Sequence, residues 1–251
     1  MLYPKCDLHI HSISSGHAFN TIDEITEYAI SKKYELIGIS DHGPAMEHAP
    51  HVGYFEMLYR LPRQSGNMAV LYGCEANIID STGNIDIPDN LIAKMDYVIA
   101  GLHKRTSYSG TNIAEHTTAI VSAIHSGKVD IISHPISLNF QTDTESIVKA
   151  ALEENVILEC NKSVLKEAVV NHNNDVIRLS TDLFNIALEA GVNILLGSDA
   201  HHISEFGISD EELMFMQEIY NISLLKMLNE NVSKLKSILQ RRKELRSSMA
   251  A

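Results

Sequence analysis

The sequence contains no tryptophan, few cysteines and no long apolar run. Its three cysteines, Cys6, Cys74 and Cys160, form no CxxC pair, and each lies in an apolar segment, which favours reduced, buried thiols over disulfides. No apolar run approaches the roughly 20 residues of a membrane-spanning helix. The N-terminus also lacks the pattern of a signal peptide. We therefore expect a cytoplasmic protein without a membrane partner.

Positive charge is also scarce. The 20 lysines and arginines stand against 32 aspartates and glutamates, for a formal net charge of −12. Such a surface repels polyanions, which disfavours nucleic acid as a partner but leaves room for a small phosphorylated substrate in a cation-lined pocket. The 251 residues, 45% of them hydrophobic, suit one globular domain, and we see no linker within residues 1–251. The sequence leaves open whether the protein forms homo-oligomers.

Short apolar runs rich in β-branched residues recur along the chain and predict seven strands: Cys6–Ile10, Leu36–Ser40, Ala69–Cys74, Tyr97–Gly101, Val129–Ser133, Val156–Cys160 and Val192–Gly197. Continuous apolar runs are typical of parallel strands that are buried on both faces. Helical patterns lie between most of them, and their predicted starts are Thr21, Asn112, Thr144 and Ser180. This alternation predicts an α/β fold with a parallel sheet, either open or closed into a barrel.

Three further segments carry expectations of their own. The proline-containing stretch Pro44–Gly66 is a poor helix, and we expect a long loop there. After Gly207 the chain becomes helical, with a capping box at Ser209–Glu212 and helical spacing over Leu224–Leu245. Its basic end, Gln240–Arg246, is interpreted as a frayed cationic helix end rather than a binding site.

Histidine is unusually abundant, with 13 residues, and many of them follow the predicted strands. Histidines or carboxylates that could bind a metal recur at regular intervals. The intervals are 33 residues from His9 to His42, 33 to Glu75, 28 to His103, 31 to His134 and 65 to Asp199. Each interval suits one βα unit, or two for the last, so these side chains should meet at the carboxyl ends of neighbouring strands. Asp7, His9 and His11 alternate along the first strand and should share one face.

About six histidines and two or three carboxylates form a donor set that suits Zn²⁺, Mn²⁺ or Fe²⁺. They are too many for one tetrahedral ion, so we expect two or three ions, with Glu75 or Asp199 as a bridge. We do not expect the remaining histidines to be ligands. His116 and His125 lie in a predicted helix, His172 lies in a polar loop, and His202 is a neighbour of His201. His48 and His51 lie in the long loop, from which they could reach substrate.

These residues resemble the four motifs of the polymerase and histidinol phosphatase (PHP) superfamily. The matching segments are Asp7-Leu-His9-Ile-His11, Ser40-Asp41-His42, Ser133-His134-Pro135 and Gly197-Ser-Asp199-Ala-His201, with Glu75 and His103 between them. The resemblance spans about residues 5–203 and looks closest to the YcdX-like stand-alone phosphatases. It implies a distorted seven-stranded (βα)7 barrel over that range. We assign the helical segment, at about 208–246 from its own sequence pattern, to the same domain.

The resemblance also implies a centre of up to three metal ions, usually zinc. One ion would take His9, His11, Glu75 and Asp199, a second would take His17, His42 and His201, and a third would take Glu75, His103 and His134. Asp7 and Asp41 would orient imidazoles rather than bind metal.

The favoured function is hydrolysis of a phosphate monoester by a metal-activated water, with Glu75 and Asp199 as the catalytic carboxylates. Candidate phosphate-binding cations are Lys104, Arg105, Arg60 and Arg63. Two alternatives remain: a nuclease of the PHP type acting on phosphodiesters, and a non-catalytic module that binds metal or a phosphorylated ligand. The net charge of −12 argues against the nuclease, and the complete ligand set argues against the non-catalytic module.

Overall fold

The computed structural model describes residues 4–220 and 226–249. Seven parallel strands pair in the order β1-β2-β4-β5-β6-β7-β8, and a short strand β3 (Gln64–Ser65) pairs with β4 in antiparallel fashion. The bounds of the parallel strands are Cys6–Asp7, Leu36–Ile39, Met68–Asn77, Tyr97–Gly101, Ile131–Ile132, Ile157–Asn161 and Ile194–Gly197. All seven expected strands are therefore present, although β1 and β6 are shorter than expected.

Backbone and side-chain contacts join the first strand to the last. Beyond their carboxyl ends, the His11 N–H donates to the Ala200 carbonyl at 2.9 Å, and the Asp199 N–H donates to the His9 carbonyl at 2.9 Å. Within the strands, the Asn229 amide donates to the carbonyls of Cys6 in β1 and Leu196 in β8, each at 2.9 Å. The sheet is therefore a nearly closed barrel, and the expected (βα)7 architecture is confirmed.

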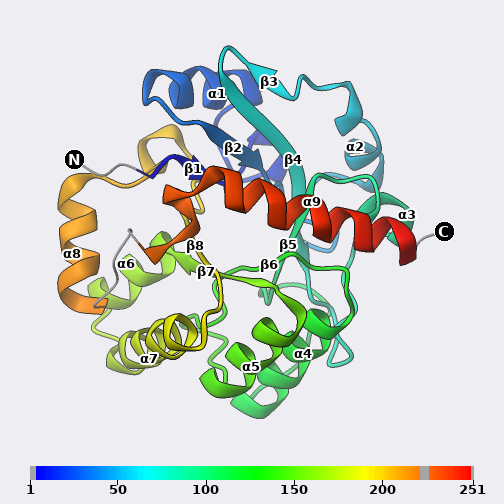
Figure 1. Cartoon of the computed structure of the whole chain (residues 1–251). Helices are drawn as coiled ribbons and strands as arrows, with labels where there is room; N and C mark the ends of the chain where they lie inside the picture. The colour runs from blue at the N-terminus through cyan, green and yellow to red at the C-terminus, as the bar shows by residue number, and fades with distance from the viewer. Residues whose placement is uncertain (1–3, 221–225, 250–251) are drawn as a thin grey trace.

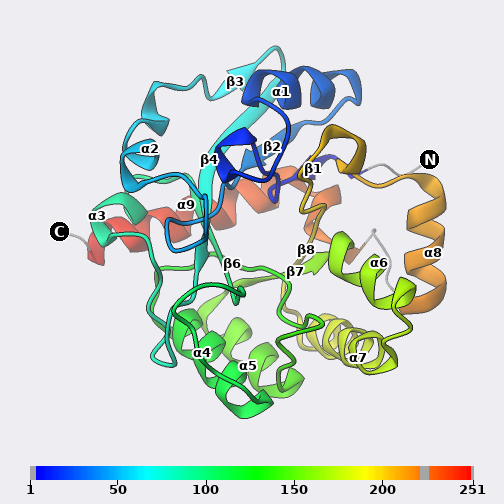
Figure 2. The ribbon, with the colours of Figure 1, turned by 180° about the vertical axis from the view of Figure 1, so that it is seen from behind.

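The barrel interior is filled by an apolar cluster that helix α9 (Val232–Met249) completes. Strand residues of this cluster alternate with residues that pack outward against helices, as the period of two in a strand requires. Figure 1 shows α9 crossing one opening of the barrel, over β4 and β5. Figure 2 gives the view from the other side, where the loops that follow the strands gather.

Helices surround the barrel, and most of them begin after a residue whose side chain caps the first turn. The helices are α1 (Ile22–Ser31), α2 (Val52–Glu56), α3 (Asp89–Ile92), α4 (Ile113–His125), α5 (Thr144–Glu154), α6 (Lys162–Val170), α7 (Asn174–Ala190), α8 (Asp210–Tyr220) and α9, with 3-10 turns η1 (Ile13–Ser15), η2 (Leu58–Arg60), η3 (Ile203–Glu205) and η5 (Leu228–Glu230). The Thr21–Glu24 capping box and the Asn112 cap are confirmed. In the described part of the chain, no helix is long and apolar enough to cross a bilayer.

Several local expectations are wrong. The Pro44–Gly66 stretch contains α2, η2 and β3 rather than loop alone, and α6 had not been predicted. Helix α7 begins after an Asn173 cap, well before Ser180. The start of the expected C-terminal helix, Leu224, lies outside the described residues.

The basic C-terminal segment is not frayed. Arg242 and Arg246 are 4% and 2% exposed, and both guanidinium groups contact the fully buried Asp130 carboxylate just before β6. Their remaining donors reach the carbonyls of Val129, Ile92 and Met95. A buried carboxylate needs compensating charge, and α9 supplies it, which is why this helix end is ordered.

We expect Arg246→Ala to lower the free energy of unfolding by about 3–5 kcal/mol, because it leaves the buried Asp130 charge partly uncompensated. Denaturant unfolding followed by circular dichroism measures this change. Arg241→Ala, on the exposed face of the same helix, is the matched control and should change stability by less than about 0.5 kcal/mol. Equal effects of the two substitutions would contradict this role of Arg246.

Candidate metal centre

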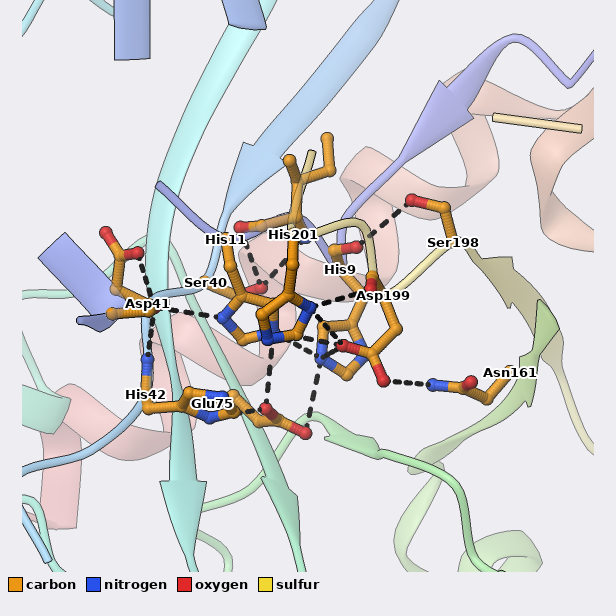
Figure 3. A network of polar contacts seen from close by, with 12 residues as sticks. His9, His11, Ser40, Asp41, His42, Glu75, Asn161, Ser198, Asp199 and His201 are labelled. Atoms are coloured by element: carbon orange, nitrogen blue, oxygen red, sulfur yellow. Dashed lines mark hydrogen bonds and ion pairs between the residues drawn. The ribbon is translucent and has the colours of Figure 1, made fainter. Parts of the chain in front are cut away.

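All nine residues that the sequence singled out as metal ligands gather at the carboxyl-terminal end of the barrel. His9 and His11 follow β1, His42 follows β2, Glu75 lies in β4, and His103 follows β5. The remaining four are His17, in the loop after η1, His134, after β6, and Asp199 and His201, after β8. Figure 3 shows His9, His11, His42, Glu75, Asp199 and His201 turned toward one another.

Glu75 lies at the centre of this cluster and is 1% exposed. Its Oε1 is 3.1 Å from His103 Nε2 and 3.0 Å from His134 Nε2. The same oxygen is 3.2 Å from His9 Nε2, while Oε2 is 2.9 Å from His42 Nδ1. One carboxylate therefore faces imidazoles from four different strand ends, as a bridging ligand would.

The ring nitrogens pair at separations that fit metal coordination. The Nε2–Nε2 distances are 3.1 Å for His9 and His11, 3.2 Å for His103 and His134, 3.2 Å for His42 and His17, and 3.1 Å for His201 and His17. Asp199 Oδ1 adds contacts of 3.2 Å and 3.4 Å to His11 and His9. Two nitrogens bound to one tetrahedral zinc at the usual length of about 2.0–2.1 Å would be about 3.3–3.4 Å apart. The donor set thus fits ions of this kind.

Hydrogen bonds at the far side of the rings fix which nitrogen faces the cluster. His9 Nδ1 lies 2.6 Å from Glu159 Oε1, and His201 Nδ1 lies 3.0 Å from the Asp199 carbonyl. Because both partners accept, each Nδ1 carries the proton and each Nε2 lone pair is free for a metal.

Ser15 and Asp41 orient the ring of His11 in a similar way. The Ser15 hydroxyl donates to Asp41 Oδ1 at 2.7 Å and accepts from His11 Nδ1 at 3.1 Å and from the His42 N–H at 3.2 Å. Asp41 therefore acts on an imidazole through Ser15, and its Oδ2 also accepts from Tyr54 at 2.5 Å.

Asp7 differs from the expectation. Its Oδ1 accepts the backbone N–H groups of His9 and Ser198 and contacts no imidazole. Strand β1 ends at Asp7, so His9 and His11 lie beyond the regular strand, where their rings face each other while the Asp7 carboxylate bonds the backbone.

The charges of the cluster suit cations. Burial would raise the pKa of the Glu75 carboxyl, but His9 and His103 hold it well below its usual value, and His9 and His11 lower the pKa of Asp199 in the same way. Burial lowers the pKa of His11 and His103, which keeps these imidazoles in the neutral form that coordinates a metal. Burial also opposes the charge on His9, but nearby carboxylates, led by Glu159, raise its pKa.

Two ligand residues adopt a left-handed backbone that is uncommon outside glycine. The φ angles are 28° at His134 and 55° at Asp199. Such conformations cost of order 1–3 kcal/mol each and persist where the surroundings hold them. They turn both side chains toward the cluster just after the strands end.

Sequence reasoning missed Glu159, which lies in β7 two residues before the strand ends at Asn161. Its carboxylate is 2% exposed and contacts His9 on one side and the His134 N–H on the other. The available signal was position: the Glu159-Cys-Asn161 segment ends its strand as the ligand motifs end theirs.

The four cations proposed for phosphate binding lie in different surroundings. Lys104 and Arg105 are exposed in the turn after His103, and Arg105 pairs with Glu47 at 3.5 Å. Arg60 lies over the ring of its neighbour Tyr59. Arg63 pairs with Asp96 at 2.8 Å and donates to two carbonyls of the η2 segment. Asp96 precedes β5, so this ion pair holds Arg63 near the amino-terminal end of the barrel, away from the ligand cluster.

The other histidines lie outside the cluster. His116 is buried between the carbonyls of Gln141 and Gly110, and His125 pairs with Glu154 at 3.2 Å. His51 caps α2 and His202 caps η3, while His48 is exposed. His172 lies in the turn between α6 and α7.

A family model described as the PHP domain matches residues 7–185. The chain belongs to the PHP family. A probable phosphatase of Caldanaerobacter subterraneus is 36% identical over 238 residues, which cover 95% of this chain and 92% of that protein. A probable phosphatase of Clostridium novyi is 37% identical over 205 residues, or 82% of each chain.

A solved PHP structure confirms the likeness in fold. The histidinol phosphate phosphatase of Lactococcus lactis, solved with zinc, L-histidinol and phosphate, superposes with a TM-score of 0.59. The match covers 95% of this chain and 94% of that one, at 16% identity. At this identity the likeness concerns the barrel architecture.

Proposed function

We propose that this PHP protein is a metal-dependent phosphoesterase that hydrolyses a phosphate monoester. The observation that carries the proposal is the convergence of seven imidazoles, Glu75 and Asp199 at one end of the barrel, with ring nitrogens 3.1–3.2 Å apart. These nine residues would hold up to three ions, with zinc favoured and manganese or iron as alternatives. The names of the relatives, probable phosphatases, support the same reaction class.

Bound divalent ions supply an activated water and neutralise charge on the phosphoryl oxygens. The protein's part is to place the ligands. Glu75 Oε1 faces His103 and His134 of the third group and His9 of the first, and Oε2 lies 3.5 Å from His11 of the first group, so Glu75 would bridge the first and third ions. Asp199 Oδ1 faces His9 and His11, its side chain is 16% exposed, and it would accept the proton of the attacking water.

The rim of the site suits a small phosphorylated substrate. Lys104 and Arg105 lie next to His103, where a phosphate could replace Glu47 as the partner of Arg105. Both are exposed, and the net charge of −12 disfavours a long polyanion. The net charge and these two cations therefore support a monoester rather than nucleic acid as the substrate.

Hydrolysis of three substrates tests this proposal: p-nitrophenyl phosphate, bis(p-nitrophenyl) phosphate and single-stranded DNA. With zinc, manganese or iron supplied, we expect the monoester to have the highest kcat/KM. Faster hydrolysis of the bis ester or of DNA would favour the nuclease alternative. No hydrolysis of any phosphate ester by the metal-loaded protein would favour a binding module.

A further inference from the structure

Glu159 is a buried carboxylate that contacts two ligand residues from different strand ends. Its Oε1 is 2.6 Å from His9 Nδ1, and its Oε2 accepts the His134 N–H at 2.9 Å. It is 2% exposed, so neither contact is replaced by bulk water. Its two oxygens thus hold one ligand by the ring and the other by the backbone.

Asn161 extends this contact to a third ligand. Its Nδ2 lies 3.0 Å from Glu159 Oε2 and 3.2 Å from Asp199 Oδ2. Its Oδ1 accepts the Val164 N–H at 2.9 Å and so caps α6. Because the cap uses the amide oxygen, the amide nitrogen must face the two carboxylates, and Asn161 links Glu159 to Asp199 in a fixed orientation.

The residues reached in this way belong to only two of the three ligand groups. His9 and Asp199 belong to the first and His134 to the third. In the part of the chain that the structure describes, neither Glu159 nor Asn161 hydrogen-bonds the side chains of the second group, which are His17, His42 and His201. The second group is held by other contacts: Ser15 accepts the His42 N–H, and His201 Nδ1 bonds the backbone carbonyl of Asp199 rather than the carboxylate that Asn161 contacts.

Gly197 makes room for this carboxylate. A Cβ at this position on β8 would overlap Glu159 Oε1 and press on His9 Cβ at 3.0 Å. Glu159 therefore occupies space that the neighbouring strand leaves open by having no side chain there.

We infer that Glu159 is a positioning residue that holds the ligands of the first and third ions together and acts little on the second. By accepting from His9 Nδ1 it keeps Nε2 free, and by accepting the His134 N–H it supports the left-handed backbone at that residue. This inference rests on the metal centre of the proposed function.

Glu159→Gln tests the role with almost no change in shape. A glutamine has one acceptor oxygen and one NH₂ group, so a donor must face either His9 Nδ1–H or the His134 N–H. The substitution therefore breaks one contact or forces His9 into the tautomer whose Nε2 carries the proton. Glu167→Gln, on the exposed face of α6, makes the same chemical change and is the matched control.

The measurement is zinc retention during dialysis against graded chelator, together with anomalous diffraction, which gives the occupancy of each zinc position in the crystal. In Glu159→Gln we expect zinc to bind roughly 10–100-fold more weakly at the first and third positions. Occupancy at the position of His17, His42 and His201 should stay at the wild-type level, and Glu167→Gln should resemble wild type throughout.

Two outcomes would overturn the inference. Wild-type occupancy at all three positions in Glu159→Gln would show that the carboxylate does not position ligands. Equal losses at all three, with a lowered Tm, would show that it only supports the fold. Wild-type protein that binds zinc but hydrolyses no phosphate ester would contradict the proposed function while leaving the occupancy result unaffected.

Discussion

Replacing His42, His134 or His201 by alanine should lower kcat/KM for a phosphate monoester by roughly 10³-fold, the upper range seen when one group that stabilises transition-state charge is removed. Each of these imidazoles has its Nε2 within 3.2 Å of another ligand-type imidazole. Removing one leaves a metal position incomplete and weakens the charge that would stabilise the phosphoryl transition state. Steady-state assays with metal resupplied give the effect.

Folding should largely survive these substitutions, because the apolar barrel interior and α9 supply the core at the other end of the strands. Activity is therefore compared at matched folded fraction, checked by circular dichroism. His125→Ala is the control: its ring is 44% exposed, pairs with Glu154 and lies at the end of α4, so near wild-type rates are expected. Loss of turnover in His125→Ala with retention in His42→Ala would show that the site has been placed wrongly.

Glu75→Ala should have a larger effect than His103→Ala on both metal content and rate. Glu75 faces His9, His103 and His134 with one oxygen and His42 with the other. Among the described residues, the His103 ring by contrast has polar contacts only with ligand residues of the third group, Glu75 and His134. Loss of the bridge should weaken two ions together and lower kcat/KM by more than roughly 10³-fold. Loss of His103 should weaken one ion.

Metal content per chain after gel filtration, measured beside the rates of both variants, distinguishes these cases. Glu75→Gln is a further comparison, since it keeps the shape but loses the charge and one acceptor, and it should fall between wild type and Glu75→Ala. Equal, small effects of Glu75→Ala and His103→Ala would show that Glu75 is structural rather than bridging.

The ligand cluster could be predicted from sequence because strand ends have a simple geometry. A parallel strand followed by a helix returns the chain to the same edge of the sheet, so residues such as His42, Glu75 and His103, spaced by one βα unit, must meet there. Apolar runs identified the strands, and caps such as Thr21 and Asn112 identified helix starts, because both signals are local.

Contacts between distant segments had no local signal. The Arg246–Asp130 ion pair joins residues 116 positions apart, and from sequence alone the arginines resembled a solvated helix end. Glu159 lies 150 positions from His9, so its role could be seen only once β7 and β1 were placed around one barrel. The left-handed φ at His134, where Glu159 accepts the backbone N–H, likewise depends on a contact between distant segments.

Elemental analysis of the purified, active protein tests the central claim most directly, because nine ligand residues in this arrangement are too many for one ion. Inductively coupled plasma mass spectrometry, referred to protein concentration from amino-acid analysis, gives equivalents of zinc, manganese and iron per chain. The geometry of the nine ligands predicts about two to three equivalents in total. An active enzyme that carries one equivalent or none would contradict the multinuclear centre.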